Sequence, residues 1–210
     1  NLATLFESLG ENQQAFSYNQ KALDIKKEIY GDKHPHTANS LNNFATVCVN
    51  LGRYEQALEY NKKALDIRKD VYGEKHSDTA SSYNGLALVY SYLGKYKLAL
   101  EYFEKALDIW EGIYGEKHEY TVNLHNNVAA MYEKLGENKK ARDYFTKALN
   151  ISKLLYGEKH PNIGDSYTGL GLVYGRLGEL EKALDYHKKA LEIWRIFYGE
   201  VHPHIASTFS

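Results

Sequence analysis

Apolar residues recur along the chain at the spacing of amphipathic α-helices. In the segment Thr79–Leu93, four apolar residues share one side of a helix: Tyr83, Leu86, Ala87 and Tyr90. In the segment Tyr96–Tyr114, seven do so: Tyr96, Ala99, Leu100, Phe103, Ala106, Leu107 and Trp110. Each stripe has the three- and four-residue steps of a helix that buries one face. The pattern predicts two helices, with the small Ala99 and Ala106 where neighbouring helix axes approach closely.

Glycines follow both predicted helices. Gly94 comes after the first segment and Gly115 after the second. Glycine adopts the left-handed conformation of a helix C-terminal cap at little steric cost. The two segments therefore form one helix–turn–helix repeat.

The repeat returns at a constant step of 42 residues. Tyrosine–glycine pairs start at Tyr30, Tyr72, Tyr114, Tyr156 and Tyr198. Other glycines keep the same step at Gly10, Gly52, Gly94, Gly136 and Gly178. A fixed period of roughly 20–50 residues is typical of stacked structural repeats. The sequence therefore predicts an all-α fold, an α-solenoid.

We expect a single array over residues 1–210. Partial repeats lie at 1–30 and 202–210, and full repeats lie at about 34–72, 76–114, 118–156 and 160–198. Arrays normally end in polar capping repeats, and the sequence shows none. We therefore expect an excerpt of a longer chain, with apolar ends that could stack head to tail.

The joint between repeats contains a YGEKH motif or a close variant of it. Its tyrosine is the last apolar residue of the second helix, and its glycine is the cap. Three joints continue with a proline: Pro35, Pro161 and Pro203. Proline fits the first turn of the next helix, where a missing N–H has no cost.

Each joint also carries a histidine: His34, His76, His118, His160 and His202. We expect these histidines to cap or pack against the following helix. Adjacent ones would lie about 10 Å apart, the diameter of a helix, which is too far to share a metal ion with bonds near about 2 Å. The sequence therefore predicts no metal site.

The repeat resembles a known family through a set of positions: Leu86, Ala87, Tyr90, Gly94, Tyr96, Ala99, Phe103 and Ala106. Together they are similar to the tetratricopeptide repeat. The 42-residue step, the histidine–proline joint and Leu41-Asn42-Asn43 resemble the kinesin-light-chain type of that repeat. The resemblance implies a right-handed superhelix whose first helices line a concave side. It also implies partners that are other proteins, without naming them.

Charge is scarce in the predicted first helices. Their windows are Asn1–Leu9, Thr37–Leu51, Thr79–Leu93, Thr121–Leu135 and Ile163–Leu177. Only five charged residues fall in them: Glu7, Glu133, Lys134, Asp165 and Arg176. The second helices and joints carry the rest, so we expect them to face water. The two cations, Lys134 and Arg176, could meet an acidic residue of a partner.

Asparagines are frequent in the same windows. Asn42, Asn84 and Asn126 recur one per repeat, Asn43 and Asn127 stand beside two of them, and Asn39, Ser81, Asn123 and Asn50 complete the set. Because a carboxamide both donates and accepts hydrogen bonds, a row of them can pair with the backbone of an extended peptide. The alternative is that they bond neighbouring helices and hold the array in shape. Thr168 and Gly169 replace the asparagine pair in the last full repeat, so the row weakens there.

Composition narrows the classes of function. Hydrophobic residues make up 43% and charged residues 25%, as in a folded chain. The 26 Lys and Arg nearly balance the 27 Asp and Glu, so no global field favours nucleic acid or an anionic membrane. Cys48 is the only cysteine, which excludes an internal disulfide and favours a reducing, cytoplasmic setting.

The sequence predicts a scaffold that binds a peptide segment of another protein on its concave face. No nucleotide-binding, zinc-protease or serine-hydrolase motif is present, so we expect neither catalysis nor a cofactor. Two alternatives stay open. The array could be the sensor or regulatory arm of a larger signalling enzyme, or it could assemble with itself head to tail.

Overall fold

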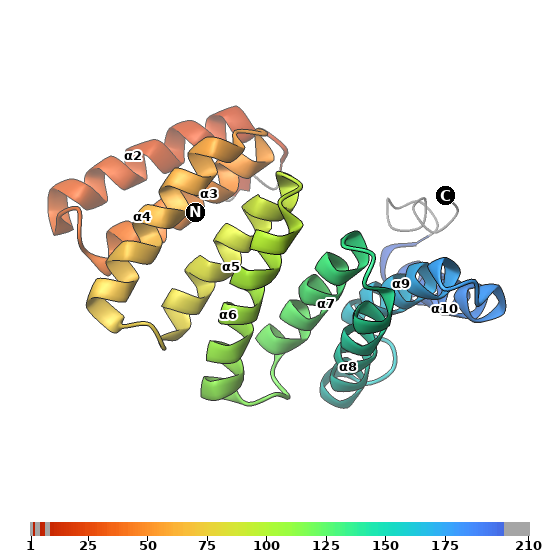
Figure 1. Ribbon diagram of the computed structural model, residues 1–210. Helices are drawn as coiled ribbons and strands as arrows, with labels where there is room; N and C mark the ends of the chain where they lie inside the picture. The colour runs from red at the N-terminus through yellow and green to blue at the C-terminus, as the bar shows by residue number, and fades with distance from the viewer. Residues whose placement is uncertain (1, 3–4, 7–8, 200–210) are drawn as a thin grey trace. The chain divides into compact units, whose positions relative to one another are not determined.

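The structure is a computed structural model that describes residue 2, residues 5–6 and residues 9–199. Across that part of the chain all regular elements are helices (Figure 1). They are α2 Asn12–Tyr30, α3 Pro35–Asn50, α4 Tyr54–Tyr72, α5 Ser77–Tyr92, α6 Tyr96–Tyr114, α7 Glu119–Lys134, α8 Asn138–Tyr156, α9 Pro161–Arg176 and α10 Leu180–Tyr198. First helices of 16 residues alternate with second helices of 19, such as α5 and α6.

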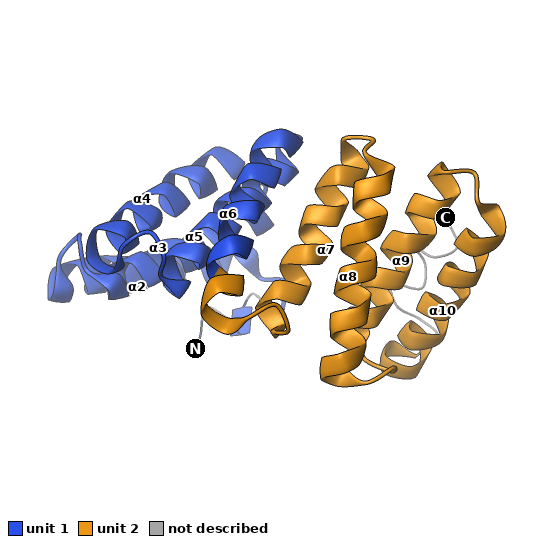
Figure 2. Ribbon diagram, turned by 60° about the horizontal axis from the view of Figure 1, so that its bottom comes forward, with its two compact units in different colours: residues 1–109 blue, residues 110–210 orange. Residues whose placement is uncertain are grey.

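The chain divides into two compact units, residues 1–109 (unit 1) and 110–210 (unit 2), shown in different colours in Figure 2. The boundary falls inside α6. Within unit 1, α3 packs between α2 and α4, α4 packs on α5, and α3 also touches α5. Within unit 2, the same order holds for α7 to α10, and α7 touches α9. In each unit, therefore, consecutive first helices lie side by side.

The joints have the predicted chemistry. The Nδ1 atom of His76 accepts a hydrogen bond from the Asp78 N–H at 3.1 Å, and its ring stacks on Tyr72 at 4.2 Å. The same cap and stack recur at His34, His118 and His160. The capping and packing role predicted for these histidines is thus confirmed, whereas His202 and Pro203 lie outside the described residues.

Helix ends also agree with the sequence pattern. Gly94 and Gly115 have φ values of +69° and +80°, the left-handed region that a side chain disfavours. Pro35 and Pro161 stand in the first turns of α3 and α9. These glycines and prolines fix the bounds of the helices from local interactions alone.

One detail of the predicted first helices is wrong. They begin two residues earlier than expected, at Ser77 in α5 and at Glu119 in α7. The physical reason is the histidine cap, which starts the helix directly after itself. Asp78 and Glu119 therefore belong to the first turns of these helices. There the positive end of the helix dipole stabilises a negatively charged carboxylate.

The core is made of apolar stripes with alanine where helices are closest. Ala99 and Ala106 of α6 are both fully buried, as their small size predicts. Phe103 is 1% exposed, and Cys48 is fully buried in α3 as a packing residue. Large rings are matched by small partners, since a Cβ built on Gly164 would lie 2.6 Å from a ring carbon of Trp194.

Candidate functional site

An open hollow of about 370 Å³ lies between α3 and α5 of unit 1. Its lining is Asn42, Asn43, Ala45, Thr46, Val49, Asn50, Asn61, Ser81, Asn84, Gly85, Leu88, Val89 and Tyr92. Five of the predicted binding residues are among them: Asn42, Asn43, Asn50, Ser81 and Asn84. None of the described residues that line this α3–α5 hollow is charged. Such a surface suits a neutral ligand. A charged group of a ligand would lose its hydration here and find no opposite charge in the lining.

Two carbonyl oxygens of the hollow lack hydrogen-bond partners. The Oδ1 atoms of Asn42 and Asn84 are buried and accept no hydrogen bond from the described part of the chain. These residues occupy equivalent positions in consecutive repeats, 42 residues apart. A buried acceptor without a donor costs about 1–3 kcal/mol. Both oxygens are closed to solvent, so this cost arises inside the fold.

The floor of the hollow depends on Asn61 and Gly85, which the sequence analysis did not select. Asn61 of α4 is 4% exposed. A Cβ on Gly85 would come within 3.0 Å of the Asn61 Oδ1 atom, so glycine leaves room for that amide. A signal was present in the sequence, because asparagine also stands at Asn19, one step before Asn61, and Gly85 replaces an asparagine found at Asn43.

The rim of the hollow is apolar and aromatic. Leu88 is 37% exposed and Tyr92 is 58% exposed. The Tyr92 ring stacks on Tyr54 with 5.7 Å between ring centroids and an interplanar angle of 6°. This stack fixes the orientation of an exposed aromatic surface next to the two unpaired carbonyls.

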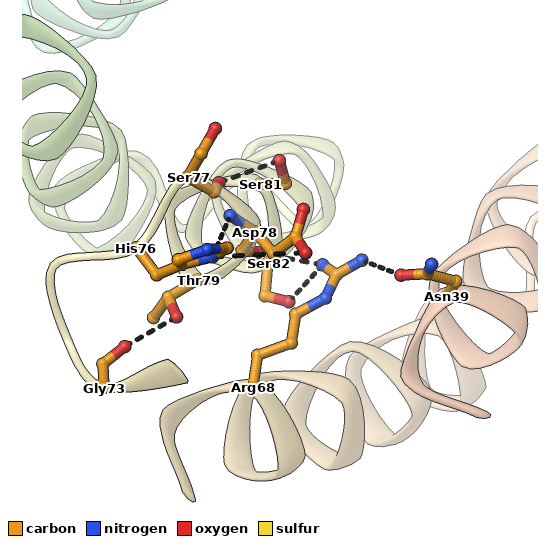
Figure 3. A network of polar contacts seen from close by, with 9 residues as sticks. All are labelled: Asn39, Arg68, Gly73, His76, Ser77, Asp78, Thr79, Ser81 and Ser82. Carbon is orange, nitrogen blue, oxygen red and sulfur yellow. Dashed lines mark hydrogen bonds and ion pairs between the residues drawn. The ribbon is translucent and has the colours of Figure 1, made fainter. Parts of the chain in front are cut away.

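Asn39 is bound by a buried arginine (Figure 3). Arg68 of α4 is 5% exposed and donates to Asn39 Oδ1 at 2.7 Å, to Ser82 Oγ at 2.7 Å and to the Asp78 carbonyl at 3.0 Å. Burial lowers the pKa of Arg68, and the nearby Asp78 charge opposes this shift. Asn39 therefore links α3 to α4, as the structural alternative for the asparagines anticipates.

The predicted residues of unit 2 mostly contact other side chains of the same unit. Asn126 Oδ1 accepts a hydrogen bond from Ser166 Oγ at 2.9 Å. Arg176 forms an ion pair with the buried carboxylate of Glu133, and Lys134 Nζ lies 3.5 Å from the same carboxylate. Asn123 is exposed and Asn127 half-buried on α7. The two cations thus already have an acidic neighbour within the chain.

Unit 2 also contains a fully buried histidine, His125 of α7. Its Nε2 atom lies 3.2 Å from Glu111 Oε1, and Lys147 Nζ lies 3.3 Å from that oxygen and 2.7 Å from Glu116. Burial, together with the nearby positive charge of Lys147 and against the opposing charge of Glu116, lowers the pKa of His125 to about 4. The imidazole is therefore neutral near pH 7. Tyr83 holds the equivalent position in unit 1.

No three His, Cys, Asp or Glu side chains of the described residues gather closely enough to hold a metal ion. No helix in the described ranges has the length and apolar character needed to cross a membrane.

Comparison with known proteins identifies the repeat. The tetratricopeptide repeat family model matches the chain over residues 1–70, 43–112, 78–153 and 120–196. No curated protein matches the sequence.

Solved structures give the same answer for the fold. BtubC (BKLC) from P. vanneervenii superposes with a TM-score of 0.81 at 26% identity, covering 96% of this chain and 80% of that one. Kinesin light chain-like TPR repeats from Podosopora anserina superpose with a TM-score of 0.79 at 19% identity. The match covers 93% of this chain and 92% of that one. The apo form of RapI superposes with a TM-score of 0.77 at 22% identity. The match covers 98% of this chain and 55% of that one. The predicted all-α repeat solenoid with kinesin-light-chain-like repeats is therefore confirmed.

Proposed function

The chain belongs to the tetratricopeptide repeat family, and on that premise we propose that unit 1 binds a peptide segment of another protein in the α3–α5 hollow. The fold is consistent with a protein–protein interaction scaffold. In this proposal the chain holds its partner without catalysing a reaction. Asn42 and Asn84 make the central contacts, and Asn43, Asn50 and Ser81 border them.

The uncharged hollow is the observation that carries the proposal, because five of the predicted binding residues line it. The amide groups of the half-buried Asn42 and Asn84 would donate to backbone carbonyls of a bound segment, and the exposed Asn43 and Asn50 would add contacts. Each bond would contribute about 0.5–1.5 kcal/mol net, and the apolar rim would add burial of side chains.

The remaining predicted residues take a secondary place in the proposal. Asn39 is occupied by Arg68 and Asn126 by Ser166. Asn123 and Asn127, together with Lys134 and Arg176, would contact a partner only where it extends over unit 2. We therefore expect substitutions in the α3–α5 hollow to weaken binding more than substitutions on α7 or α9.

The test is a selection of binding peptides from a displayed random library, followed by titration calorimetry. Selected peptides should bind the chain at least tenfold more weakly when it carries Asn42→Ala with Asn84→Ala. The matched control is Asn150→Ala, an exposed asparagine of α8, which should bind as the wild type does. Selected peptides whose affinity is indifferent to Asn42 and Asn84 would show that the hollow is not the binding site.

Association between copies is a second candidate, because α10 exposes large apolar side chains. Leu180 is 70% exposed, Leu184 is 56% exposed and Ile196 is 53% exposed. A second copy that covers them would form a larger particle. Light scattering should then show a mass that rises with concentration and returns to that of one chain in Leu180→Glu with Leu184→Glu. A constant mass equal to one chain would exclude this candidate.

A further inference from the structure

The floor of the α3–α5 hollow is the side chain of Asn61, a buried residue of α4. Asn61 is 4% exposed and lines the hollow. Its carboxamide makes no hydrogen bond with any described residue. Neither of its polar atoms is closed to solvent, in contrast to the Oδ1 atoms of Asn42 and Asn84. One repeat earlier, Asn19 donates to the Ala15 carbonyl at 3.1 Å. The Asn61 amide is therefore open to a ligand both as a donor and as an acceptor.

The same two positions of the repeat are filled differently in unit 2. Phe145 and Gly169 stand two repeats after Asn61 and Gly85. A Cβ on Gly169 would lie 2.3 Å from the Phe145 ring, so the ring packs directly against that glycine. In unit 1 the shorter Asn61 takes the place of the ring, and both Asn61 and Gly85 line the hollow. The floor of the hollow is therefore an amide at a position that unit 2 fills with an aromatic ring.

The chemistry of this floor selects the group of a ligand that can pair with it. At 4% exposure, Asn61 leaves access for the end of a side chain and not for a main chain with its neighbours. A carboxylate only accepts hydrogen bonds and an ammonium only donates them. Either charge would also lose its hydration against a lining that carries none. A second carboxamide presents its donor and its acceptor side by side, so it can pair with both polar atoms of Asn61 at once.

We infer that unit 1 recognises a glutamine or asparagine side chain of a partner segment, whose carboxamide pairs with that of Asn61. The inserted side chain lies beside Gly85, and its CH2 groups pack on Leu88 at the rim. Asn42 and Asn84 contact the main chain at the opening. This inference rests on the proposed function and adds to it a specificity-determining residue and the chemistry of the group that it selects.

Selection from a displayed random library on the full chain tests the chemistry of the ligand. Peptides selected on the wild type should share a glutamine or asparagine at one fixed position. In the tightest-binding peptide, exchange of that residue for the matching acid keeps its shape and removes its donor. Exchange for methionine or leucine, respectively, removes both the donor and the acceptor. Each exchange should weaken binding at least tenfold in titration calorimetry.

Two variants of Asn61 connect this preference to the floor of the hollow. Asn61→Leu keeps the approximate size of the side chain and removes its hydrogen bonds, so the peptide with the apolar residue should bind at least as tightly as the parent peptide. Asn61→Phe copies Phe145 of unit 2 and fills the hollow, so the parent peptide should bind at least tenfold more weakly than to the wild type. Circular dichroism shows whether each variant is folded. The matched control, Asn150→Ala, should keep the wild-type order of affinities.

Two results would overturn the inference. The first is a set of selected peptides without a carboxamide at any fixed position, as expected for a hollow that holds only water at its floor. The second is an unchanged preference for the carboxamide in folded Asn61→Leu. The peptide exchanges on the wild type decide the question even if Asn61→Phe does not fold.

The failure of this inference can be told from the failure of the proposed function. If selected peptides depend on Asn42 and Asn84 but not on a carboxamide, the hollow binds its partner without this contact and the proposed function stands. If no peptide is selected, or if the selected peptides respond to none of the three asparagines, both proposals fall.

Discussion

The first helices of unit 1 and unit 2 follow the same repeat pattern, yet the hydrogen bonding of their asparagine side chains differs. In unit 1, Asn42 and Asn84 border an uncharged hollow and their carbonyls accept no hydrogen bond from described residues. In unit 2, Asn126 accepts from Ser166, and Arg176 pairs with Glu133. The difference shows that a repeated residue type does not have a repeated role. Whether an amide is available depends on its neighbour in the adjacent helix.

The largest expected effect concerns His125, which makes unit 2 sensitive to pH. Its pKa is about 4 in the folded chain against 6.5 for free histidine, so folding favours the neutral form. The stability that it contributes is complete above pH 6.5 and is lost as the pH falls towards 4, by about 3 kcal/mol. His125→Tyr, which copies Tyr83 of unit 1, should remove most of that slope in urea unfolding measured between pH 7 and 4. A slope unchanged by the substitution would contradict the assignment, since the joint histidines remain in both proteins.

The next prediction compares the loss of stability when alanine replaces either of two glycines, Gly169 and Gly85. Both stand at the same position of the repeat. A Cβ on Gly169 would lie 2.3 Å from the Phe145 ring, whereas a Cβ on Gly85 would lie 3.0 Å from the Asn61 amide. Overpacking against a buried ring costs about 1–3 kcal/mol. Gly169→Ala should therefore lower the free energy of unfolding by that amount, and Gly85→Ala should cost less but weaken peptide binding. Equal losses of stability in the two variants would mean that the hollow of unit 1 is packed as tightly as unit 2.

The smallest effect tests the pairing of the amides directly. Asn126→Ala removes the hydrogen bond with Ser166 and should cost about 1 kcal/mol in the free energy of unfolding. Asn42→Ala removes a buried carbonyl that has no partner and should not lower the free energy of unfolding, because the cost of the unpaired acceptor is relieved. Urea unfolding of the two variants side by side is the measurement. If Asn42→Ala were the more destabilising, its amide would have a structural role and the comparison between the units would fail.

The helices and joints were predictable from the sequence because their causes are short-range. The observed bounds of α6, Tyr96 and Tyr114, are the same as those predicted from the amphipathic spacing. Local signals mark both ends of this helix. The windows Thr79–Leu93 and Thr121–Leu135 start two residues inside α5 and α7, because they were drawn from the apolar stripe and not from the histidine cap that precedes each helix.

The candidate site was predictable only in part. The sequence selected Asn42 and Asn84 but ranked them equally with Asn39 and Asn126, which the structure pairs with Arg68 and Ser166. It missed Asn61 on a second helix, although the asparagine at Asn19, one repeat earlier, was a signal for that position. Helix bonding therefore applies to Asn39 and Asn126, and groove contact by Asn42 and Asn84 stays a prediction.

The sequence by itself determined the repeat, its period, its helices and the chemistry of its joints, because each depends on residues within one or two helical turns. Only the tertiary structure decided which amides are paired with another helix. The partners of Asn39 and Asn126 lie 29 and 40 residues away along the chain. Such distances are closed by the packing of one helix on the next, which brings a donor to one carbonyl and leaves another without one.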